Sequence, residues 1–570
     1  MIAPDIIERF NSWLLPPFDS DTVKEVKKLK KNPSELEEAF CNYLEFGTGG
    51  IRGIMGVGTY RINRYTLGRC TQGLSIYIKK TNPGRQIKSV VAYDCRNNSA
   101  EFAQEVASVF AANGVKCFLF SELRTTPELS YAVRHLKADC GIVITASHNP
   151  PEYNGFKVYG SDGAQITPPM DNHVIQAIEK VCYTEVMFDT DSHLVELIDN
   201  EIDQSYFRAV LEVAQILDSD KKDLRIIFTP LHGTSITAIP QVLELAGYKD
   251  VHIVEQQSKP DGNFPTVESP NPEEINALSM ALKQAQQLGG DIVIGTDPDA
   301  DRLGIGTRKL NGEWTILSGN QTMALFTEFL LEYHQKNQTL ESNSFIVSTI
   351  VSSPIMKKIA HHYGVEFKLC LTGFKWIGKM ISESPDKKFI CGGEESFGFL
   401  VGDKVRDKDA VSATLLACEI AQILKNKGKS LYQSLIELYQ KYGIFQESLV
   451  SLTKDGKDGA LKIQAMMENL RKNPPISISN KSIIQIDDYL SGQSQNLLRS
   501  KTTILNLPRS NVLIYFLDDE SRIAIRPSGT EPKIKFYFSV QSPFDETESF
   551  DLQILKLQQR IENLKSAFSL

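Results

Sequence analysis

The stretch that decides the fold is Gly141-Ile142-Val143-Ile144-Thr145-Ala146-Ser147-His148-Asn149-Pro150, an apolar run that leads into a polar loop. A short apolar run of this kind is typical of a strand buried inside a sheet. Ser147 is therefore expected at the mouth of a buried strand, where a serine beside a histidine is a candidate nucleophile. Taken alone, such a serine is more often a turn residue or a helix N-cap.

The same plan occurs three times along the chain: a strand, a helix, a second strand and helix, and a third strand that leads into a polar loop. The predicted strands are residues 89–93, 117–120 and 141–144, then 225–228, 251–254 and 291–294, then 345–347, 365–367 and 388–390. Strands that alternate with helices indicate mostly parallel α/β sheets, which bind ligands beyond the carboxyl ends of their strands. The polar loops are therefore expected to converge on one cleft.

The last part of the chain has a different pattern. The predicted strands there are residues 511–517, 522–526 and 534–540, and an apolar stripe from Ile554 to Phe568 indicates a final helix. The polar stretch 471–500 is predicted to be a surface loop. The predicted fold is α/β: three similar α/β domains with mixed, largely parallel sheets, plus a smaller C-terminal α+β domain, around one central cleft. The predicted domains span residues 1–210, 211–325, 326–445 and 446–570.

Composition excludes several classes of protein. A chain of 570 residues is too long for one hydrophobic core. Its nine cysteines are too widely spaced for a C-x-x-C metal or redox site, and they argue against a disulfide framework. The net charge of −8, without a long basic block, predicts no nucleic-acid partner. No apolar run is long enough for a membrane span and no leader pattern is present, so we expect no membrane partner and a cytoplasmic location.

The second polar loop contains three carboxylates, Asp297, Asp299 and Asp301, spaced two residues apart. In an extended segment they point the same way and offer three hard oxygen ligands to one divalent cation. A calcium EF-hand requires glycine and glutamate where this loop has Arg302 and Arg308, so Mg²⁺ is favoured. An Asp-rich surface turn is the alternative, and the buried strand before the loop argues against it.

Two further segments suggest binding of an anion and of a sugar. Residues 526–533 combine an arginine with two hydroxyls and Gly529, which makes either an anion cradle or a plain hairpin turn. Residues 392–398 place carboxylates and a hydroxyl on a glycine-rich turn, which suits sugar hydroxyls but is also compatible with a helix cap. Residues 406–409 add cations that either face a phosphate or pair with acidic neighbours.

Taken together, these segments resemble the α-D-phosphohexomutase superfamily, and within it the phosphoglucomutase/phosphomannomutase enzymes. The matching motifs, in the order of the family, are residues 145–150, 295–302, 392–398 and 526–533, with supporting matches at 46–53 and 372–375. The resemblance covers nearly the whole chain. It implies an intramolecular phosphotransferase that acts on phosphosugars.

The resemblance also implies a role for each matching residue. The implied catalytic residues are Ser147 as the phosphoserine, His148, Arg52, and Lys157 as proton acceptor or donor at the attacking sugar hydroxyl. The implied ligands of Mg²⁺ are Ser147, through its phosphate, and Asp297, Asp299 and Asp301. The implied substrate-binding residues are Arg302, Thr372, Gly373, Glu394, Ser396, Lys408, Arg526, Ser528, Gly529 and Thr530.

The implied reaction is the interconversion of α-D-glucose 1-phosphate and glucose 6-phosphate, with glucose 1,6-bisphosphate as intermediate and activator. Mannose phosphate is an alternative substrate, because glucose and mannose differ only at C2. The branch of phosphopentomutase and glucose-1,6-bisphosphate synthase shares the chain length and residues 46–53, but commonly departs from Glu-Glu-Ser in the sugar loop. A non-catalytic phosphosugar-binding protein is the last alternative. The expected partner is a small phosphosugar, and the chain is expected to be a monomer or weak dimer.

Overall fold

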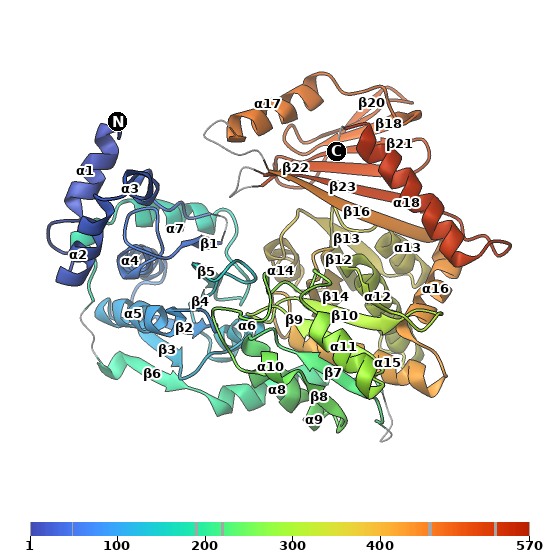
Figure 1. The fold of residues 1–570 in the computed structure, drawn as a ribbon, viewed down its shortest axis with the longest axis horizontal. Helices are drawn as coiled ribbons and strands as arrows, with labels where there is room; N and C mark the ends of the chain where they lie inside the picture. Colours follow the sequence, from blue (N-terminus) through green and yellow to red (C-terminus); the bar gives the residue numbers. More distant parts are fainter. Residues whose placement is uncertain are drawn as a thin grey trace.

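The computed structural model describes residues 2–47, 49–188, 192–217, 222–453, 459–528 and 533–568. The chain begins with the helices α1 (Pro4–Ser12), α2 (Ser20–Leu29) and α3 (Pro33–Phe40). Their apolar sides bury Trp13 and Phe40 in an aromatic cluster with Tyr65 of the first sheet unit. Figure 1 shows these helices at one end of the molecule and the C-terminal sheet at the other.

The first sheet has the strand order β1-β5-β4-β2-β3-β6. Its strands are β1 (Gly50–Ile54), β2 (Lys88–Tyr93), β3 (Lys116–Phe120), β4 (Cys140–Ile144), β5 (Tyr153–Gly160) and β6 (Val195–Ile198). Its helices are α4 (Arg64–Thr81), α5 (Ser99–Ala112), α6 (Thr126–His135) and α7 (Met170–Glu179), with short 3₁₀ turns η1 (Tyr183–Glu185) and η2 (Ser192–Leu194). Strand β4 is buried along its whole length, as its apolar run predicts.

The second and third sheets have the orders β11-β10-β9-β7-β8 and β13-β12-β14-β15. The strands of the second are β7 (Ile226–Thr229), β8 (Val251–Ile253), β9 (Ile292–Thr296), β10 (Leu303–Arg308) and β11 (Trp314–Leu317). Those of the third are β12 (Ser344–Thr349), β13 (Glu366–Cys370), β14 (Lys388–Gly393) and β15 (Phe399–Val401). The helices of these two units are α8 (Asn200–Ala214), η3 (Thr234–Thr237), α9 (Ile239–Leu245), α10 (Glu255–Ser258), α11 (Ser279–Leu288), α12 (Gly319–Lys336), α13 (Ile355–His362), α14 (Lys375–Ser382), α15 (Ala410–Asn426) and α16 (Leu431–Tyr442).

The three sheets share one core arrangement. In each, the first strand of the predicted repeat lies at the centre, flanked by the second and third strands in parallel. A fourth strand then pairs antiparallel with the third: β5 with β4, β10 with β9, and β15 with β14. Every predicted polar loop connects the third strand to the fourth. The repeat therefore places the three loops at equivalent positions.

The C-terminal unit is an antiparallel sheet with the order β16-β23-β22-β21-β18-β19-β20. Its elements are β16 (Ile444–Thr453), α17 (Gly459–Lys472), β17 (Ser477–Ile478), β18 (Lys481–Asp488), β19 (Gln493–Asn496), β20 (Lys501–Ile504), β21 (Leu513–Leu517), β22 (Arg522–Pro527), β23 (Lys533–Ser542) and α18 (Phe550–Ser566). The architecture confirms the predicted fold class. In Figure 1 this sheet stacks against the third unit.

The prediction of a surface loop at residues 471–500 is wrong. This stretch contributes β17, β18 and β19, which extend the C-terminal sheet. Few of its side chains are apolar, but Ile478, Ile483 and Ile486 are buried. Pairing with β21 supplies the backbone hydrogen bonds that a polar composition does not reveal.

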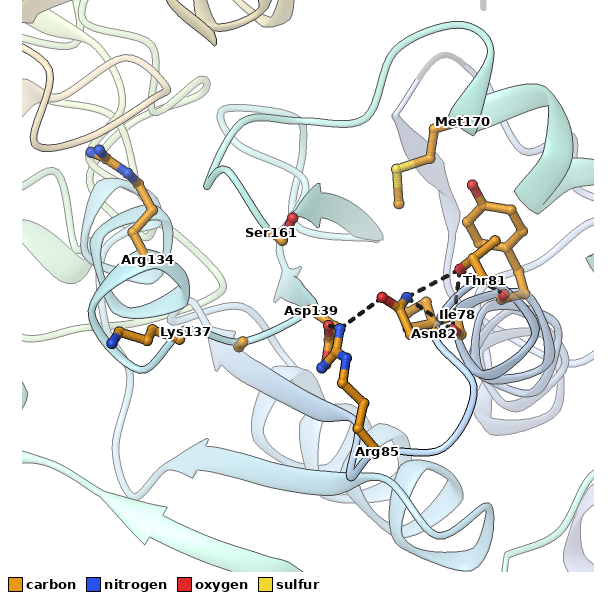
Figure 2. Close-up of a pocket in the computed structure, with 11 residues that line it drawn as sticks. Ile78, Thr81, Asn82, Arg85, Arg134, Lys137, Asp139, Ser161 and Met170 are labelled. Carbon is orange, nitrogen blue, oxygen red and sulfur yellow. Dashed lines mark hydrogen bonds and ion pairs between the residues drawn. The ribbon is translucent and has the colours of Figure 1, made fainter. Parts of the chain in front are cut away.

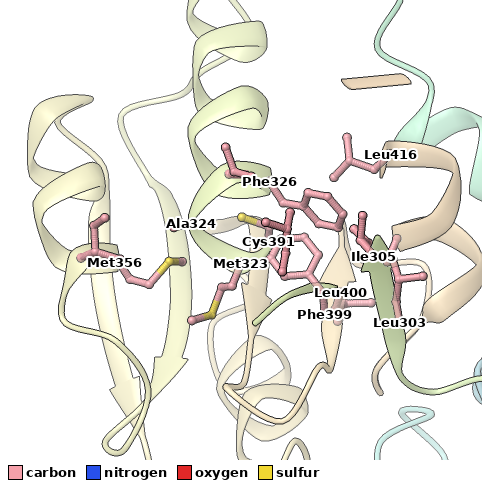
Figure 3. Close-up of a cluster of buried hydrophobic side chains, with 14 of the residues drawn as sticks. Leu303, Ile305, Met323, Ala324, Phe326, Met356, Cys391, Phe399, Leu400 and Leu416 are labelled. Atoms are coloured by element: carbon pink, nitrogen blue, oxygen red, sulfur yellow. The ribbon is translucent and has the colours of Figure 1, made fainter. Parts of the chain in front are cut away.

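One apolar cluster runs continuously through the second, third and C-terminal units. Figure 3 shows part of it, where Leu303 and Ile305 of β10 meet Phe326 of α12 and Phe399 of β15. The first sheet has separate clusters on its two faces. The second and third loops are therefore built on one packed body, to which the first unit brings its own loop. Among the described residues, no helix has the length and apolar character needed to cross a membrane.

Candidate active site

The polar loops of the three sheets meet. The hydroxyl of Ser147, on the loop after β4, donates to Oδ2 of Asp297, on the loop after β9, at 2.8 Å. At the end of that second loop, the N–H of Leu303 donates to the carbonyl of Phe397 in the third loop at 3.0 Å. The expected convergence of the loops is confirmed.

Ser147 sits in a tight, strained turn. Its φ is +53°, in the left-handed region, and its backbone N–H donates to Oγ1 of Thr145 at 2.9 Å. The side chain is buried, and its Oγ lies 3.1 Å from Nδ1 of His148. Burial, together with the nearby cations Arg302 and Arg52, lowers the pKa of His148 well below its usual value. The imidazole is therefore neutral at pH 7, and one of its ring nitrogens can accept a proton.

A buried arginine that was not predicted from the sequence binds the backbone of this loop. Arg96 follows β2, and its guanidinium donates to the backbone carbonyls of Ser147, Asn149, Pro150 and Tyr153, the first at 2.7 Å. It lies over the ring of Phe264, 5.1 Å from the centroid, and its Nε is 3.4 Å from Asp94. The available signal was a charged Asp-Cys-Arg run directly after the first strand of the repeat, at the same sheet edge as Ser147.

The acidic loop forms a compact cluster able to bind a metal ion. Asp297, Asp299 and Asp301 are almost completely buried, and one carboxylate oxygen from each lies within 4.8 Å of the others. Oδ1 of Asp299 and Oδ1 of Asp301 have no hydrogen-bond partner among the described residues. Burial and the two like charges raise the pKa of Asp297 well above its ordinary value. Three converging buried carboxylates with orphaned oxygens fit a hard divalent cation.

Contacts from three sheet units fix the shape of the acidic loop. Thr126, at the start of α6, donates its N–H to the carbonyl of Asp299 at 2.9 Å and its hydroxyl to Oδ2 at 3.0 Å. Thr234 of η3 donates twice to the carbonyl of Pro298, at 2.8 and 2.9 Å. The N–H of Ala410 donates to the carbonyl of Ala300 at 3.2 Å. The carboxylates are therefore preorganised by their surroundings.

Two lysines face the cluster. The ammonium of Lys157, on β5, lies 2.6 Å from Oδ2 of Asp299 and 3.1 Å from Oδ2 of Asp301. Lys408 lies 3.3 Å from the same oxygen of Asp301. Burial disfavours the charged form of Lys157, but the carboxylates outweigh it and raise its pKa. Gly398 leaves room for Lys408, because a Cβ at position 398 would lie 2.2 Å from Cδ of Lys408.

The two predicted arginines of the first and second units are placed differently. Arg302 has an ion pair with Glu273, and its backbone N–H donates to Oδ1 of Asp297 at 2.9 Å. Arg52 lies on β1, and its guanidinium donates to Oδ1 of Asn149 at 2.8 Å. Arg52 is exposed beside the serine loop.

The third loop presents Glu394, which is 5% exposed. Its Oε1 accepts the N–H of Gly373 at 2.7 Å, so the two predicted sugar-binding segments are in contact. Burial raises the pKa of Glu394 to about 7. The hydroxyl of Thr372 has no hydrogen-bond partner among the described residues, and Ser396 is half-buried nearby in the same loop as Glu394.

The C-terminal sheet contributes a pair of cations. Arg526 of β22 lies directly opposite Lys535 of β23, so their side chains share one face. Burial, with repulsion from Arg526 and Arg302, lowers the pKa of Lys535. The sequence analysis missed Lys535; the alternation of the hairpin was its signal. The N–H of Ser528 donates to the carbonyl of Lys533 at 2.7 Å, whereas the predicted Gly529 and Thr530 lie outside the described residues.

A separate cavity of about 570 Å³ lies elsewhere on the first unit. Figure 2 shows it between the end of α4 and the end of α6, with the ion pair of Arg85 and Asp139 between them. None of the predicted site residues that the structure describes lines this cavity. Its volume would suit a small ligand. The predicted catalytic and metal-binding residues, however, lie at the converging loops.

Three family models match successive parts of the chain. They describe the α/β/α domains I, II and III of phosphoglucomutase/phosphomannomutase, and they match residues 43–184, 204–312 and 318–442. The chain belongs to the phosphoglucomutase/phosphomannomutase family. Each matched range ends beyond the polar loop of its sheet unit, so the three converging loops lie within the family's domains.

Curated relatives cover nearly the whole length of this family member. It is 40% identical to a phosphoglucomutase of Staphylococcus aureus (strain USA300) over 529 residues, which is 91% of this chain and 94% of that protein. It is 37% identical over 560 residues to a phosphoglucomutase of Staphylococcus epidermidis (strain ATCC 35984), covering 97% of this chain and 100% of that protein. The predicted superfamily and the predicted class of phosphosugar mutase are confirmed.

Solved structures show the same fold. Parafusin from Paramecium, in its open form, superposes with a TM-score of 0.66 at 18% identity, over 92% of this chain and 96% of that one. A phosphoglucomutase/phosphomannomutase family protein from Burkholderia thailandensis gives a TM-score of 0.66 at 19% identity, over 92% and 97%. The shared architecture includes the C-terminal unit, which lies beyond the matched family models.

Proposed function

We propose that this chain is a phosphoglucomutase that interconverts α-D-glucose 1-phosphate and glucose 6-phosphate. Two relatives with this name, at 40% and 37% identity, span nearly the whole chain. The observation that carries the proposal is the 2.8 Å hydrogen bond between the buried hydroxyl of Ser147 and Asp297. It joins a candidate phosphoryl acceptor to an acidic cluster in a water-poor setting, which is the arrangement that phosphoryl transfer needs.

The acidic cluster is proposed to hold Mg²⁺ through Asp297, Asp299 and Asp301, with an oxygen of phosphorylated Ser147 as a further ligand. Bound Mg²⁺ would offset the charge of the phosphoryl group and polarise it. The protein supplies the rest of the electrostatic environment. His148 in the serine loop and Arg52 beside it would contact the phosphoryl oxygens.

Lys157 is proposed as the proton-transfer group at the sugar oxygen. Its contacts with Asp299 and Asp301 keep its ammonium protonated, which suits a donor to the departing sugar oxygen. The reverse step requires the same side chain to accept a proton. Engagement of the two carboxylates by a cation would weaken their hold on Lys157 and ease that step.

Substrate positioning is proposed to involve two separate units. Glu394 and Ser396, with Thr372 and Gly373, would contact the sugar hydroxyls, because they offer both acceptors and donors at one loop junction. The non-reacting phosphate would be held by Arg526, Ser528 and Lys535, together with Gly529 and Thr530, which lie outside the described residues. Lys408 and Arg302 would lie beside the reacting end of the substrate. A phosphate clamp on a separate unit accommodates glucose 1,6-bisphosphate in either orientation. We also propose that the chain divides into four domains at residues 210, 325 and 445, because each of the four units contributes one segment to this site.

Substrate choice is tested by kcat/KM for the 1-phosphates of glucose, mannose, ribose and glucosamine, with catalytic glucose 1,6-bisphosphate present. We expect the highest value with glucose 1-phosphate. A higher value with ribose or mannose phosphate would assign the chain to that activity within the same chemistry. The cytoplasmic location and the monomeric or weakly dimeric state stay predictions.

A further inference from the structure

The sugar loop is anchored to the segment that follows β12. The hydroxyl of Ser352 donates to Oε2 of Glu395 at 2.8 Å, and the N–H of Glu395 donates back to Oγ of Ser352 at 3.2 Å. The hydroxyl of Thr349 lies 2.8 Å from Oγ of Ser352 and 3.4 Å from Oε2 of Glu395. Glu395 is flanked in sequence by the proposed sugar-binding residues Glu394 and Ser396, so Ser352 sets the position of that loop.

Ser352 also receives a contact from the C-terminal sheet. Arg522, at the start of β22, donates through its guanidinium to the backbone carbonyl of Ser352. Arg522 is buried, and the strand register places Ser539 directly between it and Glu447 of β16. Burial disfavours the charge of Arg522, and the nearby carboxylates of Glu447, Glu395 and Asp487 offset part of that cost. The hydrogen bond to the carbonyl of Ser352 is its direct contact across the interface, and breaking it would leave a buried donor unsatisfied.

Apolar side chains surround this contact on both sides of the interface. One cluster combines Ile350, Val351 and Leu371 of the third unit with Tyr489, Val512, Ile514, Ala524 and Tyr537 of the C-terminal unit. The burial of this cluster keeps water away from the bond between Arg522 and Ser352. Charge-assisted hydrogen bonds are strongest in such surroundings.

The same strand carries the phosphate clamp. Arg526 is four residues after Arg522 on β22, so the two side chains share one face of the sheet about 13 Å apart along the strand. One end of this rigid strand thus faces the non-reacting phosphate. The other end contacts the support of the sugar loop.

We propose that Arg522 is a positioning residue that couples phosphate binding at the clamp to the orientation of the sugar loop, through Ser352 and Glu395. Phosphate held by Arg526 fixes β22, and β22 then fixes Ser352 and the loop that carries Glu394 and Ser396. Arg522 touches neither the sugar nor the reacting phosphoryl group. The inference rests on the proposed function, because it assumes that the clamp and the sugar loop bind one substrate.

The kinetic test uses Arg522→Met, which keeps an unbranched apolar stem but removes the guanidinium and its donors. We expect KM for glucose 1-phosphate to rise about tenfold, the scale of one charge-assisted hydrogen bond. We expect kcat to change by less than about twofold, because Ser147 and the acidic cluster are untouched. In Arg522→Lys the rise in KM should be smaller than in Arg522→Met, because an ammonium can still donate to the carbonyl of Ser352.

A second readout does not depend on turnover. Inorganic phosphate should slow hydrogen exchange at residues 349–353 and 392–398 in the wild-type protein, and this protection should be absent in Arg522→Met. If the wild-type protein shows the protection but has no mutase activity, the proposed function fails and the coupling stands. If the mutase is active but phosphate protects these segments equally in both proteins, the coupling is wrong.

Arg560→Met is the matched control. Arg560 donates to the carbonyls of Gln541 and Asp519 and to the hydroxyl of Ser521, all within the C-terminal unit. Its loss should lower stability while leaving KM and the phosphate-dependent protection at wild-type values. The same KM change in Arg560→Met would contradict the proposal. If Arg522→Met does not fold, Ser352→Ala breaks the other end of the connection, and a wild-type KM in that variant would equally contradict it.

Discussion

Ser147 and Asp297 lie 150 positions apart in the chain, yet their side chains share a hydrogen bond of 2.8 Å. Both residues follow the third strand of their repeat and precede an antiparallel fourth strand. Because the two sheets have the same core arrangement, their loops occupy equivalent positions and can face each other. One repeated topology thus brings the proposed nucleophile and the acidic cluster together.

Asp299→Asn is expected to weaken Mg²⁺ binding at least about tenfold, because it removes one of three charged oxygen ligands. Calorimetric titration of Mg²⁺ measures this directly, and the Mg²⁺ dependence of turnover should shift in the same direction. Asp403→Asn, at an exposed carboxylate away from the cluster, is the control and should bind Mg²⁺ normally. Full turnover of the wild-type enzyme in excess chelator would show that the cluster is not the required metal site.

Arg96→Lys is expected to loosen the serine loop, because a lysine cannot reproduce the fork that donates to four backbone carbonyls. We expect a stability loss of about 2–4 kcal/mol and a fall in kcat larger than any rise in KM. Urea unfolding and steady-state kinetics measure the two effects. An unchanged kcat in a folded Arg96→Lys protein would rule out this positioning role.

Lys535→Met is expected to weaken the hold on the non-reacting phosphate. Lys535 and Arg526 are the two cations that the C-terminal hairpin places side by side. Removing one should raise KM for glucose 1-phosphate and the inhibition constant of inorganic phosphate together, by about tenfold. Lys481→Met, which alters an exposed lysine of β18 in the same sheet, is the comparison. Equal effects in both variants would argue for general charge attraction instead of a defined contact.

Glu447 should make stability depend on pH. Burial raises its pKa to about 7 from an ordinary value of 4.5. The folded protein therefore holds this proton more tightly than the unfolded chain does, and the resulting stability is complete below pH 4.5 and lost as pH rises through about 7. Glu447→Gln should remove this loss, on the order of 2 kcal/mol. Urea unfolding of both proteins at pH 5 and pH 8 measures it, and parallel pH profiles would contradict the assignment.

The sequence was sufficient for the elements whose local pattern matches their environment. Residues 141–144 are apolar and lie in the fully buried β4. Asp297, Asp299 and Asp301 form the expected cluster of carboxylates. They converge through a tight turn, with Ala300 at a φ of +59°, and the expectation of an extended segment was wrong. In both cases the chemistry is encoded within a few consecutive residues. The convergence of the loops also followed, because parallel strands direct their carboxyl ends to one edge.

Contacts that depend on register or on distant segments could not be predicted in the same way. Arg96 and Lys535 are ordinary charged residues in the sequence, and their roles arise only when a loop or a facing strand is placed beside them. The strands in residues 471–500 were missed because their polar side chains alternate with few apolar ones. Pairing fixes them: β18 pairs with β21, and β17 and β19 pair with β18. Tertiary contacts supply the information that local composition lacks.

The central claim is that Ser147 carries the phosphoryl group, and its most direct test is the mass of the intact protein after incubation with glucose 1,6-bisphosphate and Mg²⁺. The account predicts that the wild-type protein gains one phosphoryl group, which peptide mapping places on Ser147. It predicts that Ser147→Ala gains none, folds normally and shows no mutase turnover. Mutase activity in Ser147→Ala, or a phosphoryl group on another residue of an active wild-type enzyme, would contradict the claim.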